Sequence, residues 1–197
     1  MSPALGSMSM SIDSSFTSFH SPRLRLTPIG AADAAGMYPG LQSPRLYDYI
    51  PDAPPSSIDA LAQRYARLAR GRSPDGGELW YNWVVRDAVD DRPLGFVQAT
   101  IGIDEGSPCL LAYVIFESAW GRGIGREAVS ALIAHLRDTL GRIEFKALID
   151  TRNARSIGLV ESLQFRRVAT HVAADYVKGE QSDEYEYRLP PEERGPT

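Results

Sequence analysis

The sequence has few of the features that mark secreted, membrane-spanning or disulfide-linked proteins. Cys109 is its single cysteine, so no intramolecular disulfide can form, and such usage is typical of a reducing compartment. No apolar run approaches the roughly 18 residues needed to span a bilayer. The N-terminus lacks the charged and apolar regions of a secretory signal. We therefore expect a cytoplasmic protein without a membrane partner.

An excess of positive charge is also missing. The 197 residues include 21 Lys and Arg against 25 Asp and Glu, which gives a formal net charge of −4. The sequence also contains no basic stretch interleaved with aromatic residues. Together with the negative net charge, this argues against a nucleic-acid partner. The histidines His20, His135 and His171 lack the spacing of metal ligands, so we expect no metal site. Hydrophobic residues make up 43% of the chain, enough for one domain with a full core.

The chain does contain a glycine-rich stretch between an apolar run and an amphipathic segment. Residues 110–116 are apolar and rich in β-branched side chains, residues 121–125 are G-R-G-I-G, and residues 128–140 have apolar side chains at helical spacing. This order predicts a strand, a loop and a helix. Glycines let backbone N–H groups approach a ligand, and a helix start adds partial positive charge. The loop therefore suits a phosphate or pyrophosphate.

Two common phosphate-binding patterns do not fit this stretch. A P-loop needs Lys followed by Ser or Thr after its last glycine, whereas Arg126 and Glu127 follow Gly125. A dinucleotide-binding fold needs G-x-G-x-x-G with an acidic residue about 20 residues later, and this pattern is not present either. The phrase W-G-R-G-I-G-R-E-A at residues 120–128 instead resembles the acetyl-coenzyme A loop of the GNAT acetyltransferases. It is similar to the branch that contains the ribosomal-protein N-terminal (alanine) acetyltransferases.

Two further phrases carry the same resemblance. They are S-P-R-L-R-L-T-P-I-G-A-A-D-A at residues 21–34 and D-T-R-N-A-R-S-I-G-L-V-E-S-L-Q-F-R at residues 150–166. The resemblance covers residues 23–189 and implies an α/β (α+β) GNAT fold. That fold is a mixed, mostly antiparallel sheet of six or seven strands flanked by about four helices, with a β-α-β acetyl-CoA core.

Hydrophobic periodicity agrees with this order of elements. Strands are expected at residues 23–28, 78–86, 94–103, 110–116, 143–149, 167–176 and 183–189, and helices at 56–68, 128–140 and 153–163. The strands that flank residues 128–140 should be parallel, because a helix connects them. Residues 1–20 are rich in Ser and Met and are expected to be a disordered leader. A single domain should span residues 21–190, and residues 191–197 should be a frayed tail.

The resemblance also implies where acetyl-CoA would bind. Backbone N–H groups from Arg122 to Arg126 would hold the pyrophosphate, and the N–H of Ile115 would donate to the acyl carbonyl. Asn153 would meet the pantetheine arm, and it is also a suitable helix N-cap. The implied coenzyme-binding residues are Ile115, Phe116, Trp120, Gly121, Arg122, Gly123, Ile124, Gly125, Arg126, Asn153 and Ser156.

The catalytic groups are less clearly indicated. Many family members place a Tyr seven residues after this Asn to protonate the leaving thiolate, and Val160 stands there in this chain. By the same resemblance Ser156 is the substitute acid, and the alternative is a packing residue. Glu117, Asp48 and Asp52 are candidate general bases, and the alternative for each is a surface carboxylate. Cys109 has no nearby His to activate it as a nucleophile.

The acceptor side is expected in the Pro-bounded loop that holds Tyr47, Asp48 and Tyr49. This loop is either a wall for an amine or a solvated connection. We expect direct transfer of an acetyl group from acetyl-CoA to a primary amine in a ternary complex, the amine being a protein or peptide N-terminus or a small molecule. A non-catalytic acyl-CoA-binding regulatory module is the alternative, because the Tyr is missing and Gln164 replaces the family's Gly. A homodimer is compatible with the sequence.

Overall fold

The computed structural model describes residues 16–104, 106–141 and 143–191. Within them, eight strands form one sheet in the order β1-β2-β3-β4-β5-β6-β8-β7, accompanied by four α-helices and short 3-10 turns. The strands are β1 Phe19–His20, β2 Leu24–Pro28, β3 Glu78–Asp87, β4 Pro93–Gly102, β5 Cys109–Ile115, β6 Phe145–Asp150, β7 Arg166–Val177 and β8 Glu180–Leu189. The helices are α2 Ala34–Met37, α3 Ile58–Leu68, α4 Ile124–Leu140 and α5 Ala154–Ser162. The predicted mixed, mostly antiparallel sheet is confirmed. None of the described helices is long and apolar enough to cross a membrane.

The sheet has one strand more than predicted, because residues 16–20 belong to the fold. The prediction of a disordered leader was wrong for this segment: β1 pairs antiparallel with β2. The ring of Phe19 meets the edge of Trp83 with centroids 5.4 Å apart, and Trp83 Nε1 donates to the Thr17 carbonyl at 2.9 Å. Burial of aromatic rings thus orders a segment whose composition is that of a flexible tail. The rest of the predicted leader, residues 1–15, lies outside the described residues.

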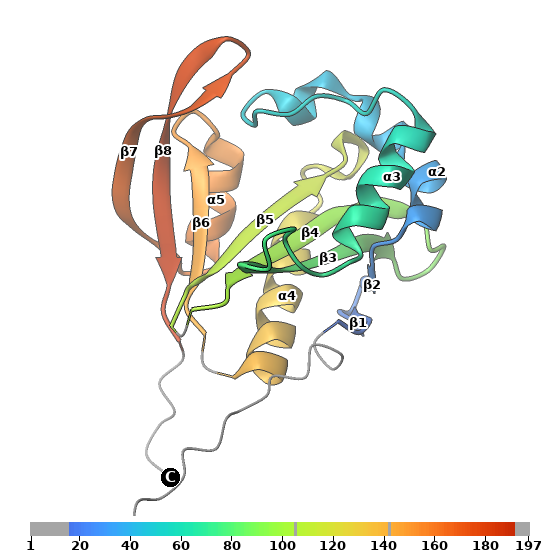
Figure 1. The fold of residues 1–197 in the computed structure, drawn as a ribbon, viewed down its shortest axis with the longest axis horizontal. Helices are drawn as coiled ribbons and strands as arrows, with labels where there is room; N and C mark the ends of the chain where they lie inside the picture. The colour runs from blue at the N-terminus through green and yellow to red at the C-terminus, as the bar shows by residue number, and fades with distance from the viewer. Residues whose placement is uncertain (1–15, 105, 142, 192–197) are drawn as a thin grey trace, which may run out of the picture.

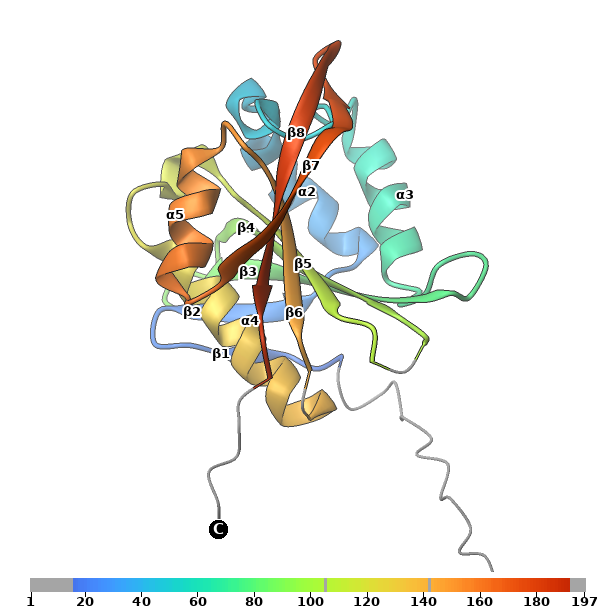
Figure 2. The same cartoon turned by 90° about the vertical axis from the view of Figure 1, so that its left-hand side faces the viewer.

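Helices cover both faces of the sheet, as Figure 2 shows: α4 and α5 lie on one side, and α2 and α3 on the other. Side chains alternate between the two faces along each strand, so each face of the sheet carries its own hydrophobic cluster. Tyr81, Trp83 and Val85 of β3 pack in the cluster that includes α4, whereas Val84 packs against α2 and α3. α4 contributes six side chains at helical spacing to the first cluster, namely Ile124, Ala128, Val129, Leu132, Ile133 and Leu136.

The starts of three helices show how the sequence sets element boundaries. Ser57 caps α3, since its Oγ accepts from the Ala60 N–H at 3.1 Å. Asn153 caps α5 in the same way, as its Oδ1 accepts from the Ser156 N–H at 3.1 Å. α4 begins at Ile124, earlier than the predicted 128–140, because Gly123 adopts a left-handed φ of 74° directly before it.

β5 and β6 are parallel, as predicted, but they pair only at their first residues. Cys109 lies opposite Phe145 and Leu110 opposite Lys146, after which the two strands separate. β5 stays paired with β4 as far as Ile115, and β6 stays paired with β8. Figure 1 shows β5 and β6 starting side by side and diverging toward the loop that precedes α4. The sheet thus opens into a wedge whose edges carry main-chain groups without a strand partner.

Candidate active site

The wedge between β5 and β6 holds a cavity of about 1070 Å³. Its walls are the end of β5, the end of β6, the start of α4, the start of α5 and residues 45–51. The helix starts lie on one face of the sheet and residues 45–51 on the other, so the cavity passes through the sheet. Its volume suits an extended ligand with a second molecule beside it.

The glycine-rich loop lies on the wall of this cavity. Gly121 and Gly123 adopt left-handed φ values of 70° and 74°, which side chains other than glycine rarely take. The first hydrogen bond of α4 runs from the Glu127 N–H to the Gly123 carbonyl at 3.1 Å. The N–H groups of residues 124–126 therefore have no helical partner, and they form the start of the helix where an anion is stabilised.

Gly125 lies where side chains of α5 and β5 approach the start of α4 closely. A Cβ at this position would lie 2.9 Å from Leu159 Cδ1 and 3.4 Å from Ile115 Cγ1. A side chain here would require the end of the Leu159 side chain to move. Of the predicted loop residues, Trp120, Gly121, Gly123, Ile124, Gly125 and Arg126 line the cavity, and Arg122 does not.

The loop is anchored from the N-terminal part of the chain. Glu127 accepts from the Ser21 hydroxyl at 2.7 Å, from the Arg23 N–H at 2.9 Å and from Arg23 Nε at 2.6 Å. Arg23 Nη1 in turn donates to the Arg122 carbonyl at 3.0 Å. Burial by itself raises the pKa of Glu127, but these hydrogen bonds outweigh it and lower the pKa below its usual value. Glu127 and Arg23 thus hold the loop without entering the cavity.

Ile115 presents main-chain groups to the wedge. The N–H of the next residue, Phe116, donates to the Leu94 carbonyl of β4 at 2.8 Å. Because main-chain groups alternate in direction along a strand, the Ile115 N–H points away from β4 into the wedge. The Ile115 carbonyl accepts from Trp120 Nε1 at 2.7 Å. Phe116 itself, predicted to contact coenzyme, is buried on the α2 and α3 side and does not line the cavity.

Trp120 contacts side chains from both sides of the cavity. The guanidinium carbon of Arg155 lies 4.2 Å from the Trp120 ring centroid, and that of Arg45 lies 5.1 Å from it. These are cation–π contacts with residues from α5 and from the segment before the acceptor loop. All three side chains line the cavity, so this indole fixes the geometry of the strand end, the loop and α5 together.

The start of α5 brings together a predicted and an unpredicted hydroxyl. Ser156 and Asn153 both line the cavity, and so does Tyr113 of β5. Tyr113 Oη donates weakly to the Ser156 carbonyl at 3.4 Å, and burial raises the pKa of Tyr113 to about 12. Sequence reasoning missed Tyr113, although it lies two residues before Ile115 and therefore on the same face of the strand. Val160, at the family's Tyr position, is buried in the core.

Three of the predicted acid, base and acceptor residues do not line the cavity, and Glu117 and Tyr47 are two of them. Glu117 accepts from the Ser43 hydroxyl at 2.6 Å and from Arg45, and these hydrogen bonds, Ser43 first, lower its pKa. A carboxylate held in this way is a weak base. Tyr47 is buried, and its Oη donates to the Leu41 carbonyl at 2.9 Å. Both residues instead stabilise the segment that approaches the strand end.

Asp48 and Tyr49 do line the cavity, on the wall formed by residues 45–51. Asp48 forms an ion pair with Lys178 Nζ at 2.6 Å, which connects this loop to the turn between β7 and β8. Asp52 pairs with Arg64 at 2.7 Å and lies outside the cavity wall. Further charged residues on the wall were not predicted: Arg45, Asp150, Arg152, Arg155 and Glu184. Asp150, Arg152 and Arg155 lie close together in the sequence, within residues 150–155, whereas Arg45 and Glu184 come from distant parts of the chain.

Comparison with known proteins agrees with this geometry. A family model described as an acetyltransferase (GNAT) domain matches residues 23–166. No curated protein matches the chain in a sequence search. Solved structures do match the fold, at identities that by themselves show the fold alone.

Three of these structures illustrate the likeness. A ribosomal-protein alanine acetyltransferase from Vibrio fischeri has a TM-score of 0.77 at 19% identity, over 91% of this chain and 99% of that one. A ribosomal-protein α-N-acetyltransferase in complex with coenzyme A has a TM-score of 0.75 at 17% identity, over 87% and 96%. Spermidine N-acetyltransferase from Vibrio cholerae, with coenzyme A and spermine, has a TM-score of 0.72 at 18% identity, over 87% and 97%. Since the family model matches more than half of the chain and the cavity lies at its glycine-rich loop, the chain belongs to the GNAT acetyltransferase family.

Proposed function

We propose that this protein is an acetyl-CoA-dependent N-acetyltransferase that transfers the acetyl group directly to a primary amine in a ternary complex. The observation that carries the proposal is the cavity that passes through the sheet at the separation of β5 from β6. A thioester entering along α4 and α5 would meet an amine entering past residues 45–51. The two reactants could then react without a covalent enzyme intermediate.

The donor half of the site supports this chemistry. The helix start at residues 124–126 suits the pyrophosphate of the coenzyme, with Arg126 adding charge on the cavity wall. The Ile115 N–H suits the acyl carbonyl, where it would stabilise the negative charge that develops on oxygen during attack. Ser156 is our candidate donor of a proton to the leaving thiolate, and Tyr113 is a second hydroxyl on the same wall.

The acceptor is proposed as a primary amine at a protein or peptide N-terminus or on a small molecule. Two of the similar structures are named for ribosomal-protein substrates and one for spermidine. The acceptor wall has both signs of charge, with Arg45 and Asp48 from one loop and Glu184 from β8. A cytoplasmic location and a homodimer stay predictions, as does the absence of nucleic-acid, membrane and metal partners.

Coenzyme A release with a panel of N-terminal peptides and small amines tests this proposal. Acetyl-CoA at 100 times its Kd should also stabilise the fold by about 2.7 kcal/mol. Release that depends on one acceptor class supports the enzyme and identifies its substrate. Stabilisation without release for any amine would instead support a non-catalytic acyl-CoA-binding module. Absence of both would refute the proposal.

The variant Ser156→Ala tests the proposed acid. If Ser156 protonates the thiolate, kcat should fall by about 100-fold while acetyl-CoA affinity changes little. Tyr113→Phe is the matched comparison, since it removes the neighbouring hydroxyl and keeps the ring. An unchanged kcat in Ser156→Ala would remove this residue from the mechanism, and a loss confined to Tyr113→Phe would transfer the role to the phenol.

A further inference from the structure

Acetyl transfer to an amine needs a group that removes a proton from the acceptor, because primary amines are mostly protonated at neutral pH. Three carboxylates line the cavity among the described residues: Asp48, Asp150 and Glu184. They differ in the hydrogen bonds and ion pairs that their oxygens already form.

Two of these carboxylates are held by fixed partners. Asp48 pairs with Lys178 Nζ at 2.6 Å. Asp150 accepts from Arg152 Nη2 at 2.6 Å, from the Arg152 N–H at 2.8 Å and from the Ser182 hydroxyl at 2.6 Å. Burial by itself raises the pKa of Asp150, but these bonds outweigh it and lower the pKa below its usual value. A carboxylate stabilised in its charged form is a poor proton acceptor.

Among the described residues, no hydrogen bond or ion pair of this kind holds the Glu184 carboxylate, and its position suits the acceptor. It lies on β8 directly opposite Asp150 of β6. The neighbouring Tyr185 and Tyr187 pack toward the core that includes α4 and α5, so alternation turns Glu184 to the face of residues 45–51. Beyond the pairs Cys109–Phe145 and Leu110–Lys146, β5 and β6 diverge, and the cavity lies between them. Glu184, beside the end of β6, and Ile115, at the end of β5, both line that cavity.

The charges around Glu184 are of both signs. Asp175 and His171 face it from β7, and Asp150 and Lys146 face it from β6. Burial and then the charge of Asp175 raise the pKa of Glu184 above its usual value, and His171 and Lys146 only partly oppose this. A carboxylate whose pKa is raised toward neutral pH is still deprotonated in most molecules, and it binds a proton more tightly than an ordinary carboxylate does. Both properties favour a general base.

We propose that Glu184 is the general base of the acetyl transfer, facing the acceptor nitrogen across the cavity. Its carboxylate takes one proton from the acceptor ammonium. The freed lone pair forms the C–N bond at the thioester carbonyl carbon, and the C–S bond breaks with its electron pair on sulfur. Nitrogen then loses its second proton, which passes to the thiolate through the Ser156 hydroxyl, so that the products are the amide, the free thiol and the protonated Glu184. This inference rests on the proposed acetyltransferase activity.

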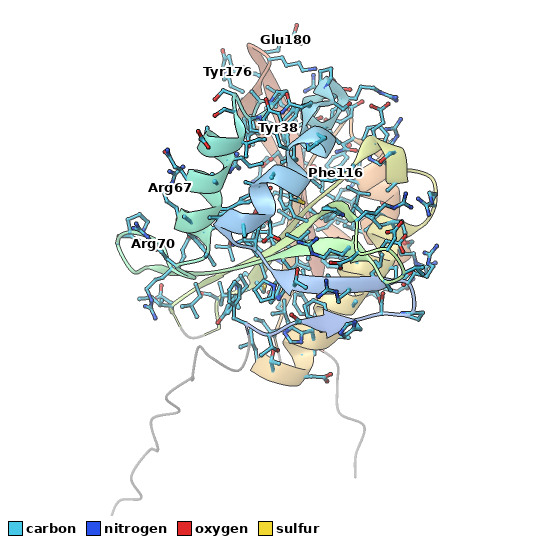
Figure 3. All side chains as sticks on the ribbon, turned by 90° about the vertical axis from the view of Figure 1, so that its right-hand side faces the viewer. Tyr38, Arg67, Arg70, Phe116, Tyr176 and Glu180 are labelled. Atoms are coloured by element: carbon cyan, nitrogen blue, oxygen red, sulfur yellow. The ribbon has the colours of Figure 1, made fainter. Side chains whose placement is uncertain are left out.

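The test compares Glu184→Gln with Glu180→Gln, which removes a carboxylate from the same strand at the far tip of the hairpin. Figure 3 shows Glu180 and Tyr176 at that tip, above Phe116 at the end of β5. Steady-state kinetics are measured from pH 5.5 to pH 9.5 with acetyl-CoA and the accepted amine, and acetyl-CoA affinity is measured by calorimetry. Asp175→Asn and Asp48→Asn serve as further comparisons.

Glu184→Gln should lower kcat by about 100-fold or more near neutral pH, with acetyl-CoA affinity within about two-fold of the parent. In the parent, kcat should rise with pH as the Glu184 carboxyl loses its proton, and this rise should be lost in Glu184→Gln. The difference in kcat between the two proteins should shrink at high pH, where the amine is already neutral. Glu180→Gln should behave as the parent. Parental rates in Glu184→Gln, or a comparable loss in Asp175→Asn or Asp48→Asn alone, would overturn the assignment. If the parent releases no coenzyme A with any amine, both this inference and the proposed activity fall.

Discussion

Asn153 combines a structural contact with a position on the cavity wall, so substitutions there must separate stability from coenzyme binding. Its Oδ1 caps α5 by accepting from the Ser156 N–H, while its amide nitrogen is free to donate toward the pantetheine arm. Asn153→Ala removes both functions. Asn153→Asp keeps the capping oxygen, places a negative charge at a helix start, where it is favourable, and removes the donor.

We expect Asn153→Ala to lower the free energy of unfolding by about 1 kcal/mol, whereas Asn153→Asp should unfold close to the parent temperature. Both should bind acetyl-CoA less tightly. Thermal unfolding and calorimetric titration measure the two effects separately. If Asn153→Asp bound acetyl-CoA as tightly as the parent, Asn153 would be a cap only.

At the scale of elements, the connection from α5 to β7 shows how the fold keeps a family-typical backbone without the family's glycine. Gln164 adopts φ 68°, the left-handed conformation that a glycine takes after a helix. Its N–H donates to the Glu161 carbonyl at 3.0 Å, and Phe165 then enters the core. The side chain is tolerated here at the cost of backbone strain, about 1 kcal/mol for a residue other than glycine.

Gln164→Gly should therefore raise the free energy of unfolding by up to roughly 0.5 kcal/mol, since the relief of about 1 kcal/mol of strain exceeds the roughly 0.5 kcal/mol or more of entropy that glycine adds to the unfolded chain. Gln164→Ala is the matched control, because it removes the long side chain and keeps the Cβ. Denaturant unfolding of both variants measures the difference. Equal gains in the two would locate the effect in the side chain and not in the backbone.

Elements that are specified by residues close together in the sequence could be predicted, whereas features that depend on contacts between distant residues could not. The periodicity of residues 128–140 and the alternation of the strands predicted α4, the hairpin of β3 and β4 and the parallel crossover, because each pattern lies within one element. Glu117 was misassigned because its partners Ser43 and Arg45 are 74 and 72 residues away in sequence. Long-range contacts decided the orientation of such loop residues, and no spacing in the sequence encodes them.

At the scale of the whole molecule, charged contacts connect the three C-terminal strands of the sheet. The C-terminal strands meet at Glu186 of β8, a buried carboxylate on the sheet face. It contacts His171 Nε2 of β7 at 2.9 Å, Arg188 Nε at 2.7 Å and Lys146 Nζ of β6 at 3.5 Å. Burial alone raises the pKa of Glu186, but these partners outweigh it and hold the pKa at about 2.

The sign of the resulting pH dependence follows from linkage. A carboxylate whose pKa is lower in the folded than in the unfolded state stabilises the fold above its unfolded pKa, near 4.5, and this stability is lost as the pH falls toward 2. We expect the Tm of the parent to fall steeply between pH 4.5 and pH 2.5. Glu186→Gln should start from a lower Tm at pH 6, because its charged partners lose their counterion, and it should lose less on acidification. Thermal unfolding across this range measures both slopes, and parallel profiles for the two proteins would show that acid unfolding begins at other carboxylates.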